Sequence, residues 1–264
     1  MVGLVTRRTD RLGDDRFDVV FYEVKDVTGR RTVPEAGAVN MVSCHGDTAR
    51  CEDPSYVALD RAGRPATRER PYFDWSYVCP THPGYRAELL ELVEACADVA
   101  PAVRLDDVGF PRQEYCHCER CERRFAESEF SDRFAWRAEV VSSFVEDARD
   151  RVPGRLYLTL YPDPMPGHLY DRNGLDLEHL ETLVDTFVVP IYDLAYTTTY
   201  WIEVLASGFA DRLGSPFVVE LYGPEVDPER LRHAMTVAEA YASTVAVAYD
   251  DDRAVEAVES GWLH

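Results

Sequence analysis

Three cysteines lie within one short segment, Tyr115-Cys116-His117-Cys118-Glu119-Arg120-Cys121. A tight loop that enters a helix can point three thiolates at one centre, and thiolates favour Zn(II) in a closed tetrahedral site. We expect the following helix to begin near Arg123, after the last of these cysteines. The spacing therefore predicts three of the four ligands of a zinc ion.

The fourth ligand must come from another part of the chain. Cys79 is the first choice, because Cys79-Pro80 forms a rigid turn just before a predicted helix that carries Cys96 on its apolar side. The other candidates are Cys44, Cys51, His45 and His117. A site closed by four cysteines leaves no position for water, so the zinc would be structural rather than catalytic. The alternative is a set of free or oxidisable thiols packed in a loop.

Carboxylates follow several apolar segments of the chain. These segments end in acids at Asp106-Asp107, Asp163, Asp193, Glu220 and Asp250. Two carboxyl groups at one site can hydrolyse a glycosidic bond, one of them as an acid whose pKa is raised. Glu220 follows the apolar run 216–219, and an ionised glutamate in an interior position needs a partner or a cavity. Any single acid can equally be a solvated strand end of an acidic protein.

The elements that would position these acids are alternating strands and amphipathic helices. Helical faces run from Leu89 to Ala97 and from Val140 to Ala148, and Asp227-Pro228-Glu229 has the pattern of a helix start. Alternation of this kind indicates parallel βαβ units. The apolar strand-like runs are Phe17–Val24, Ala38–Ser43, Ala102–Val108, Leu156–Tyr161, Phe187–Tyr192, Phe217–Tyr222 and Val245–Tyr249.

This spacing predicts an α/β fold, a single glycosidase-like (β/α)8 barrel domain over residues 1–264. An open doubly wound sheet would show a glycine-rich phosphate turn, which the sequence lacks. The remaining strand is either Val2–Thr6 or part of the irregular segment 56–78, so the barrel could also be incomplete or distorted at its N-terminal strands. In a barrel the carboxyl ends of the strands meet at one mouth, which would bring distant acids together.

The segment from Tyr72 to Phe125 resembles a known family. Cys79-Pro-Thr-His-Pro-Gly-Tyr-Arg86, a helix, a strand ending in acids and the run from Cys116 to Phe125 are similar to the part of family 42 β-galactosidases that places a four-cysteine zinc site beside the fourth-strand catalytic acid. Uncharacterised glycoside-hydrolase-like barrels share this layout. The resemblance implies zinc on Cys79, Cys116, Cys118 and Cys121. The family has an Asn-Glu pair where this chain has Asp106-Asp107, and it has further domains, so β-galactosidase activity is not implied.

The resemblance also implies a retaining glycoside hydrolase with Glu220 as nucleophile and Asp107 as acid/base, about 5–5.5 Å apart. Asp106 could exchange roles with Asp107, because side chains alternate along a strand and only one of the two should face the mouth. Two other arrangements stay open. Arg104-Leu105-Asp106 resembles the fourth-strand motif of α-amylase-like barrels, in which the aspartate is the nucleophile and strand five carries a glutamate where this chain has Asp163. A pair of Asp106 and Asp193 resembles α-galactosidase-like barrels.

Aromatic side chains gather near the same strand ends, where flat rings could bind the apolar faces of sugars. Most of them should be packing residues. Trp201 and Tyr222 are the favoured sugar contacts, and Tyr192 and Arg104 complete the predicted substrate-binding set. Three histidines near the candidate loops receive no catalytic role: His45, His82 and His168.

The chain is strongly acidic. It has 28 Lys+Arg against 48 Asp+Glu, for a net charge of -20, and Lys25 is its only lysine. Such a surface would repel nucleic acid and anionic membranes, and it resembles the surface of halophilic cytosolic proteins. The N-terminal segment lacks the apolar run of a signal peptide, and no later stretch is long enough to span a bilayer. We therefore expect a cytoplasmic protein whose thiols stay reduced or bind metal.

These patterns favour a carbohydrate hydrolase that uses two carboxylates and carries a structural zinc ion. The second hypothesis is a barrel that binds a sugar or another small ligand without hydrolysing it. A hydrolase with zinc in the chemistry would need histidine-rich ligands at the strand ends, and the sequence does not offer them.

Overall fold

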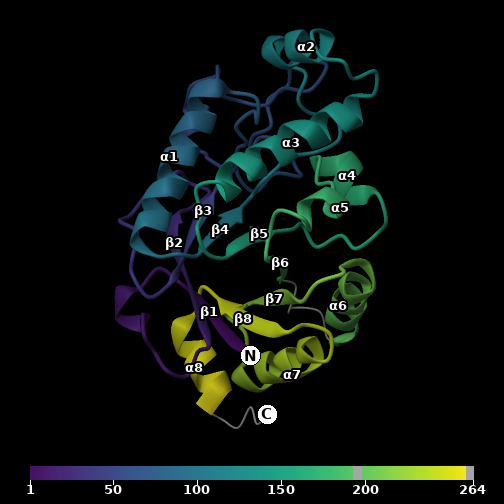
Figure 1. Cartoon of the computed structure of the whole chain (residues 1–264). Helices are drawn as coiled ribbons and strands as arrows, with labels where there is room; N and C mark the ends of the chain where they lie inside the picture. Colours follow the sequence, from purple (N-terminus) through teal and green to yellow (C-terminus); the bar gives the residue numbers. More distant parts are fainter. Residues whose placement is uncertain (193–197, 260–264) are drawn as a thin grey trace.

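Eight parallel strands form a closed barrel in which the strand order follows the chain. The computed structural model describes residues 1–192 and 198–259. β1 pairs with β2 on one side and with β8 on the other, which closes the sheet (Figure 1). The predicted (β/α)8 barrel is therefore confirmed. The strands are β1 Val2–Thr6, β2 Val19–Lys25, β3 Val39–Ser43, β4 Val103–Asp106, β5 Leu156–Thr159, β6 Thr186–Ile191, β7 Phe217–Tyr222 and β8 Thr244–Ala248.

The strand that the sequence left undecided is β1. All five of its residues are buried, and it pairs along its length with both neighbours, so the barrel is complete at its N-terminal strands. Residues 56–78, all of which the structure describes, form isolated antiparallel bridges instead, such as Val57 with Val78 and Leu59 with Pro65. The segment is thus a long loop after β3 that reaches over the mouth side of the barrel.

Helices surround the barrel (Figure 1). Several of them pack against the sheet through an apolar face, as in α1, where Leu89, Val93 and Cys96 are buried, whereas α2 buries only Cys121. No helix in the described part of the chain is long and apolar enough to cross a membrane. The helices are α1 Pro83–Val99, α2 Glu119–Ala126, α3 Arg133–Arg149, α4 His168–Asn173, α5 Leu177–Leu180, α6 Tyr200–Arg212, α7 Pro228–Glu239 and α8 Asp251–Glu259.

Two helix starts were predicted, one correctly. The side chain of Asp227 accepts hydrogen bonds from the backbone N–H groups of Glu229 and Arg230, which caps α7 as expected. α2 begins at Glu119 rather than near Arg123, so the last cysteine of the cluster lies inside the helix. Acidic side chains in the first turn favour this earlier start, because they face the positive end of the helix dipole.

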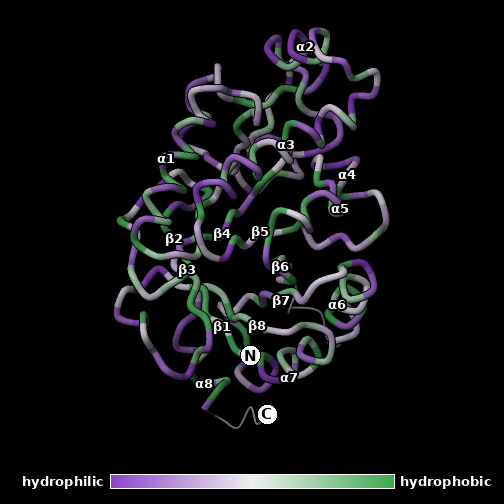
Figure 2. The backbone as a smooth tube through the Cα atoms, in the orientation of Figure 1, coloured by the Kyte–Doolittle hydropathy of each residue, from purple (hydrophilic) through white to green (hydrophobic). Residues whose placement is uncertain are grey.

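The interior of the barrel changes from apolar to charged along its axis. Phe21 and Tyr157 pack edge to face inside the sheet with ring centroids 5.3 Å apart. The guanidinium of Arg104 lies 5.1 Å from the centroid of the Phe21 ring. The hydropathy colouring shows hydrophobic segments among the strands and many hydrophilic segments in the outer helices and loops (Figure 2). The charged side chain of Arg104 therefore packs on the apolar rings of the barrel interior.

Arg137 of α3 connects the segment before the cysteine cluster to α4 from inside the protein. It is 1% exposed, and its guanidinium donates hydrogen bonds to the backbone oxygens of Arg112, Gln113, Asp171 and Arg172. The first two residues precede the cysteine cluster, and the other two belong to α4. One buried side chain thus helps to hold the cysteine segment against the helical layer.

Candidate functional site

A cavity of about 770 Å³ opens at the carboxyl ends of the strands. This is the face at which (β/α)8 barrels carry their catalytic and ligand sites. Its walls come from strand ends spread over most of the chain, so the barrel does bring distant residues together. The lining residues are Arg7, Glu23, Val27, Trp75, Asp106, Asp107, Thr159, Leu160, Tyr161, Pro162, Pro190, Tyr192, Tyr222, Pro224 and Tyr249.

Asp106 and Asp107 both line this cavity, although the sequence analysis expected only one of them to face the mouth. The expectation was wrong because β4 ends at Asp106, and Asp107 has a φ of 49°, in the left-handed region. The alternation of side chains applies only within the strand. The turn at Asp107 therefore directs a second carboxyl group to the same space.

Asp107 lies in surroundings that favour its protonated form. The residue is 9% exposed, and its Oδ2 lies 2.8 Å from Oγ of Ser43. Burial, followed by the negative charge of Asp106, raises the pKa of Asp107 to about 8, and the hydrogen bond from Ser43 opposes the shift. A carboxyl group that keeps its proton near neutral pH can donate that proton to a substrate.

Glu220 of β7 is fully buried and is not among the described residues that line the cavity. Its carboxylate forms an ion pair with Arg104 and accepts a hydrogen bond from the hydroxyl of Tyr192. Arg104 also donates from Nε to Oγ1 of Thr159 at 2.9 Å. The sequence indicated that an interior glutamate needs a partner or a cavity, and in the structure Glu220 has partners. Its carboxylate therefore contacts Arg104 and Tyr192 rather than the open space of the cavity.

Arg104 connects the buried carboxylate to the cavity. It is 1% exposed and does not itself belong to the described lining. Its Nη2 lies 3.7 Å from Oδ1 of Asp106, so one guanidinium contacts both Glu220 and an acid of the cavity wall. Arg104 therefore holds Asp106 from behind instead of contacting a bound molecule directly.

The predicted aromatic contacts separate into two groups. Tyr192 and Tyr222 line the cavity with ring centroids 5.4 Å apart, and Tyr249 joins them at 6.2 Å from Tyr222. Trp201 lies on α6, is 48% exposed and is not part of the described lining. The aromatic wall is therefore built from strand ends, and α6 does not contribute its tryptophan to it.

The other predicted acids lie elsewhere or outside the described residues. Asp163 is hydrogen-bonded through Oδ2 to Nδ1 of His168 at 3.0 Å. It lines a separate hollow beside α4. Asp250 accepts a hydrogen bond from the backbone N–H of Arg253 in the first turn of α8. Asp193 lies outside the described residues. The described part of the structure therefore brings neither Asp163 nor Asp250 into the cavity beside Asp106.

Sequence analysis missed a third acid of the cavity, Glu23 of β2. It is 7% exposed, forms an ion pair with Arg7, and lies 3.4 Å from the hydroxyl of Tyr249. Burial raises the pKa of Glu23, and the contact with Arg7 opposes the shift. The signal was available, because Glu23 interrupts an apolar strand just as Glu220 does.

The four cysteines predicted as ligands form one group. Sγ atoms of Cys79, Cys116, Cys118 and Cys121 all lie within 4.8 Å of one another, with 3.4 Å between Cys79 and Cys121. A tetrahedral zinc ion with Zn–S bonds of about 2.3 Å would separate its sulfurs by about 3.8 Å, close to this spacing. The backbone N–H of Leu59 donates to Sγ of Cys116 at 3.3 Å, which would stabilise a thiolate. These residues could hold a metal ion.

The remaining cysteines and the histidines that had been considered as ligands lie outside this group. Cys44 and Cys51 are free thiols near β3, and Cys96 is buried on α1 as predicted. His45 accepts a hydrogen bond from the backbone N–H of Gly109, and burial lowers its pKa to about 3. Nδ1 of His117 contacts Glu122 instead of the sulfurs.

Comparisons with known proteins give matches in structure only. No protein family matches the sequence, and no curated protein does. The chain is similar to the PgaB (BpsB) glycoside hydrolase domain from Bordetella bronchiseptica, with a TM-score of 0.72 and 15% identity over 95% of this chain and 89% of that one. It is also similar to a class V chitinase from Pseudomonas fluorescens Pf-5, with a TM-score of 0.60 and 12% identity over 100% of this chain and 99% of that one.

At these identities the similarity shows the fold and not the activity. Neither protein is described as a family 42 β-galactosidase or as a zinc protein, so the resemblance to that family stays a prediction. The structural neighbours of this chain are glycoside hydrolases with a (β/α)8 barrel.

Proposed function

We propose that the protein hydrolyses glycosidic bonds in the mouth cavity, with Asp107 as the proton donor. The observation that carries this proposal is the placement of two adjacent carboxyl groups in one cavity, one of them with a raised pKa. Glycoside hydrolysis uses such a pair, because the leaving oxygen needs a proton while the sugar develops positive charge. The fold shared with glycoside hydrolases supports the same reaction class.

The carbohydrate would bind against the aromatic wall. Rings of Tyr192, Tyr222 and Tyr249 and the indole of Trp75 face the cavity from several sides. Such rings pack on the C–H faces of sugars, while the acids and Arg7 supply hydrogen bonds to hydroxyl groups. The cavity volume of about 770 Å³ lies within the range of small-molecule sites.

We assign the second carboxylate to Asp106 rather than to Glu220. Asp106 reaches the cavity and is held by Arg104, so it can stabilise positive charge at the anomeric carbon or attack it. The resemblance to family 42 implied Glu220 as the nucleophile of a retaining reaction. In that role its carboxylate would first have to leave both Arg104 and Tyr192. Glu220 instead positions Arg104, and a retaining outcome would then require a covalent intermediate on Asp106.

We also propose that the four-cysteine group binds zinc in a structural role. The donor set of four thiols leaves no ligand position for water. The metal would hold the segment 115–121 against the loop after β3. From there a series of ring contacts leads to the cavity wall, from Tyr115 to Phe73 at 5.6 Å, to Tyr77 at 5.4 Å and to Trp75 at 6.0 Å.

Activity of single variants on a panel of aryl glycosides and oligosaccharides tests the proposal. Asp107→Asn and Asp106→Asn should each lower kcat by about a hundredfold or more, which is the contribution expected of a positioned acid or carboxylate. Trp201→Ala, outside the described lining, is the control and should keep wild-type kcat. Full turnover by Asp107→Asn would remove Asp107 from the mechanism. Thermal stabilisation by sugars with no product from any of them would favour the binding protein over the hydrolase.

A further inference from the structure

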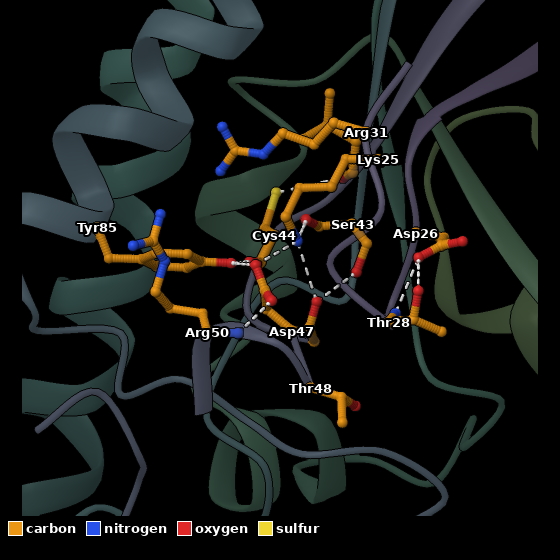
Figure 3. Close-up of polar contacts among 12 residues, drawn as sticks. Lys25, Asp26, Thr28, Arg31, Ser43, Cys44, Asp47, Thr48, Arg50 and Tyr85 are labelled. Carbon is orange, nitrogen blue, oxygen red and sulfur yellow. Dashed lines mark hydrogen bonds and ion pairs between the residues drawn. The ribbon is translucent and has the colours of Figure 1, made fainter. Parts of the chain in front are cut away.

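Asp107 is backed by a buried polar cluster that does not line the cavity. The cluster consists of Lys25 at the end of β2, Ser43 at the end of β3, and Gly46 and Asp47 in the loop that follows. Figure 3 shows Lys25, Ser43 and Asp47 close together. Ser43 is 1% exposed and Lys25 is fully buried. Groups buried this completely beside a candidate catalytic acid need an explanation, because burying a charge and a hydroxyl has a cost in free energy.

The hydroxyl of Ser43 lies between two acceptors. Its Oγ is 2.8 Å from Oδ2 of Asp107 and 2.9 Å from the backbone oxygen of Gly46. A hydroxyl group has one hydrogen, so it can donate to only one of these oxygens at a time. When Asp107 is ionised, Ser43 donates to its carboxylate. When Asp107 carries its proton on Oδ1, the oxygen from which a substrate can take it, Ser43 still donates to Oδ2. When the proton is on Oδ2, the carboxyl group donates to Oγ and the serine hydrogen turns to Gly46.

Both protonation states of Asp107 are therefore hydrogen-bonded without movement of any heavy atom. A group that gives a proton to a leaving oxygen and then takes one from water passes through both states in each reaction cycle. Any rearrangement between the two states would add to the barrier. Ser43 removes this need by rotating a single bond.

Gly46 leaves the space that this arrangement requires. A Cβ atom added to Gly46 would lie 2.8 Å from Nε1 of Trp75, and 3.1 Å from both Oδ2 of Asp107 and Oγ of Ser43. Such distances are shorter than ordinary contacts, so a side chain would displace the carboxyl group or the indole. Nε1 of Trp75 is buried and has no hydrogen-bond partner within the described structure, which leaves the indole held by packing alone.

Lys25 supplies the charge behind these two residues. Its Nζ donates to the backbone oxygens of Ser43 at 2.7 Å and Gly46 at 3.1 Å, and it lies 3.1 Å from Oδ2 of Asp47. Tyr85 donates a hydrogen bond to Asp47 or to the neighbouring backbone oxygen of Cys44, which it contacts at 2.9 and 2.7 Å (Figure 3). The ammonium is thus fixed in place, and its charge favours the ionised form of Asp107 against the effect of burial.

We propose that Ser43 and Gly46, held by Lys25, are positioning residues that keep the carboxyl group of Asp107 in one place in both of its protonation states. The inference rests on the proposed role of Asp107 as proton donor. The charged and titratable groups that face Asp107 are Lys25 of β2, His45 after β3, Arg104 and Asp106 of β4, Tyr77 of the loop after β3, and Tyr161 after β5.

The first test follows the titration of Asp107 itself, by carbon NMR of protein labelled at the aspartate carboxyl carbons. Asp107→Asn identifies the resonance. Ser43→Ala should raise the pKa of Asp107 by about one unit, because the ionised form loses a donor. Ser243→Ala removes a similar hydroxyl-to-carbonyl hydrogen bond at the opposite end of the barrel and should leave the titration unchanged. Equal titration of Asp107 in Ser43→Ala and in wild type would overturn the inference.

The second test measures kcat against pH. Gly46→Ala should lower kcat about tenfold or more through displacement of the carboxyl group. Gly84→Ala is the matched control, because its Cβ would meet only His82, at 3.5 Å, and it should keep wild-type kcat. In Ser43→Ala the loss of activity at high pH should move upward with the pKa of Asp107. Wild-type kcat and an unmoved pH profile in both Gly46→Ala and Ser43→Ala would overturn the inference.

The two proposals can fail separately. If no glycoside is hydrolysed by the wild-type protein, the proposed function fails, and the carboxyl titration still decides the role of Ser43. If Asp107→Asn is inactive while Ser43→Ala and Gly46→Ala behave as wild type, the function stands and the positioning role fails. Unchanged melting temperatures confirm that each variant is folded.

Discussion

Replacing Asp107 by asparagine should make the stability of the protein less dependent on pH. Asparagine has nearly the shape of the protonated carboxyl group, and its amide can donate to Ser43 as the carboxyl O–H would. It cannot ionise. The variant therefore removes one titration from the folded protein and leaves the cavity and the hydrogen bond nearly unchanged.

The size and sign of the effect follow from the pKa of Asp107, which burial raises from 3.8 to about 8. Between these two values the folded protein binds a proton that the unfolded chain has released. Its free energy of unfolding then falls by about 1.4 kcal/mol for each unit of rising pH, and this contribution is lost once the pH passes the folded pKa. The stability of Asp107→Asn relative to wild type should thus grow by up to about 4 kcal/mol from about pH 5 to about pH 8.

Urea unfolding followed by tryptophan fluorescence measures this difference. Comparing variant with wild type at each pH cancels the other titrating groups, including Glu23, as long as they act independently. Asp74→Asn is the matched control, because Asp74 is exposed and lies in the loop after β3, next to the cavity residue Trp75. The reasoning is refuted if the gain of Asp107→Asn between the two pH values is no larger than that of Asp74→Asn.

Three further predictions test other parts of the structure. Cys118→Ser should abolish zinc binding and lower the melting temperature by about 10 °C or more, because metal binding is coupled to folding. Cys96→Ser is the control and should keep the zinc content. Metal analysis and melting curves check both variants, and a metal-free wild-type protein would refute the zinc site. Glu220→Gln should lower the free energy of unfolding by about 3 kcal/mol or more, since a buried arginine loses its carboxylate, and wild-type stability in urea would contradict this. Tyr222→Ala should raise KM about tenfold and Trp201→Ala by less than about twofold, so equal KM values would remove Tyr222 from the binding surface.

The barrel could be predicted from the sequence because strands that are buried on both faces are long apolar runs. β1 was the exception. Its five residues are buried, but a short segment at the start of the chain shows no period of its own, and only its pairing with both β2 and β8 identifies it as a strand. Closure of a sheet is a long-range property, which local patterns do not contain.

The cysteine group could be predicted because three thiols within six residues have the close spacing that metal-ligating cysteines show. The carboxylates were harder. Asp106 and Asp107 were found, but the left-handed backbone at Asp107 breaks the periodicity on which the prediction of a single inward acid depended. Glu220 was singled out correctly as a buried charge. The sequence could not decide between a partner and a cavity, because the partner, Arg104, comes from another strand.

Arg137 holds the segment 112–113 and α4 through their backbone oxygens alone. A contact of this kind does not depend on which side chains these segments carry. Positions 112, 113, 171 and 172 are thus free to diverge among related sequences without loosening the contact, while position 137 is not. Saturation mutagenesis should therefore find one intolerant arginine facing four permissive neighbours, a pattern that a search for co-varying pairs would miss.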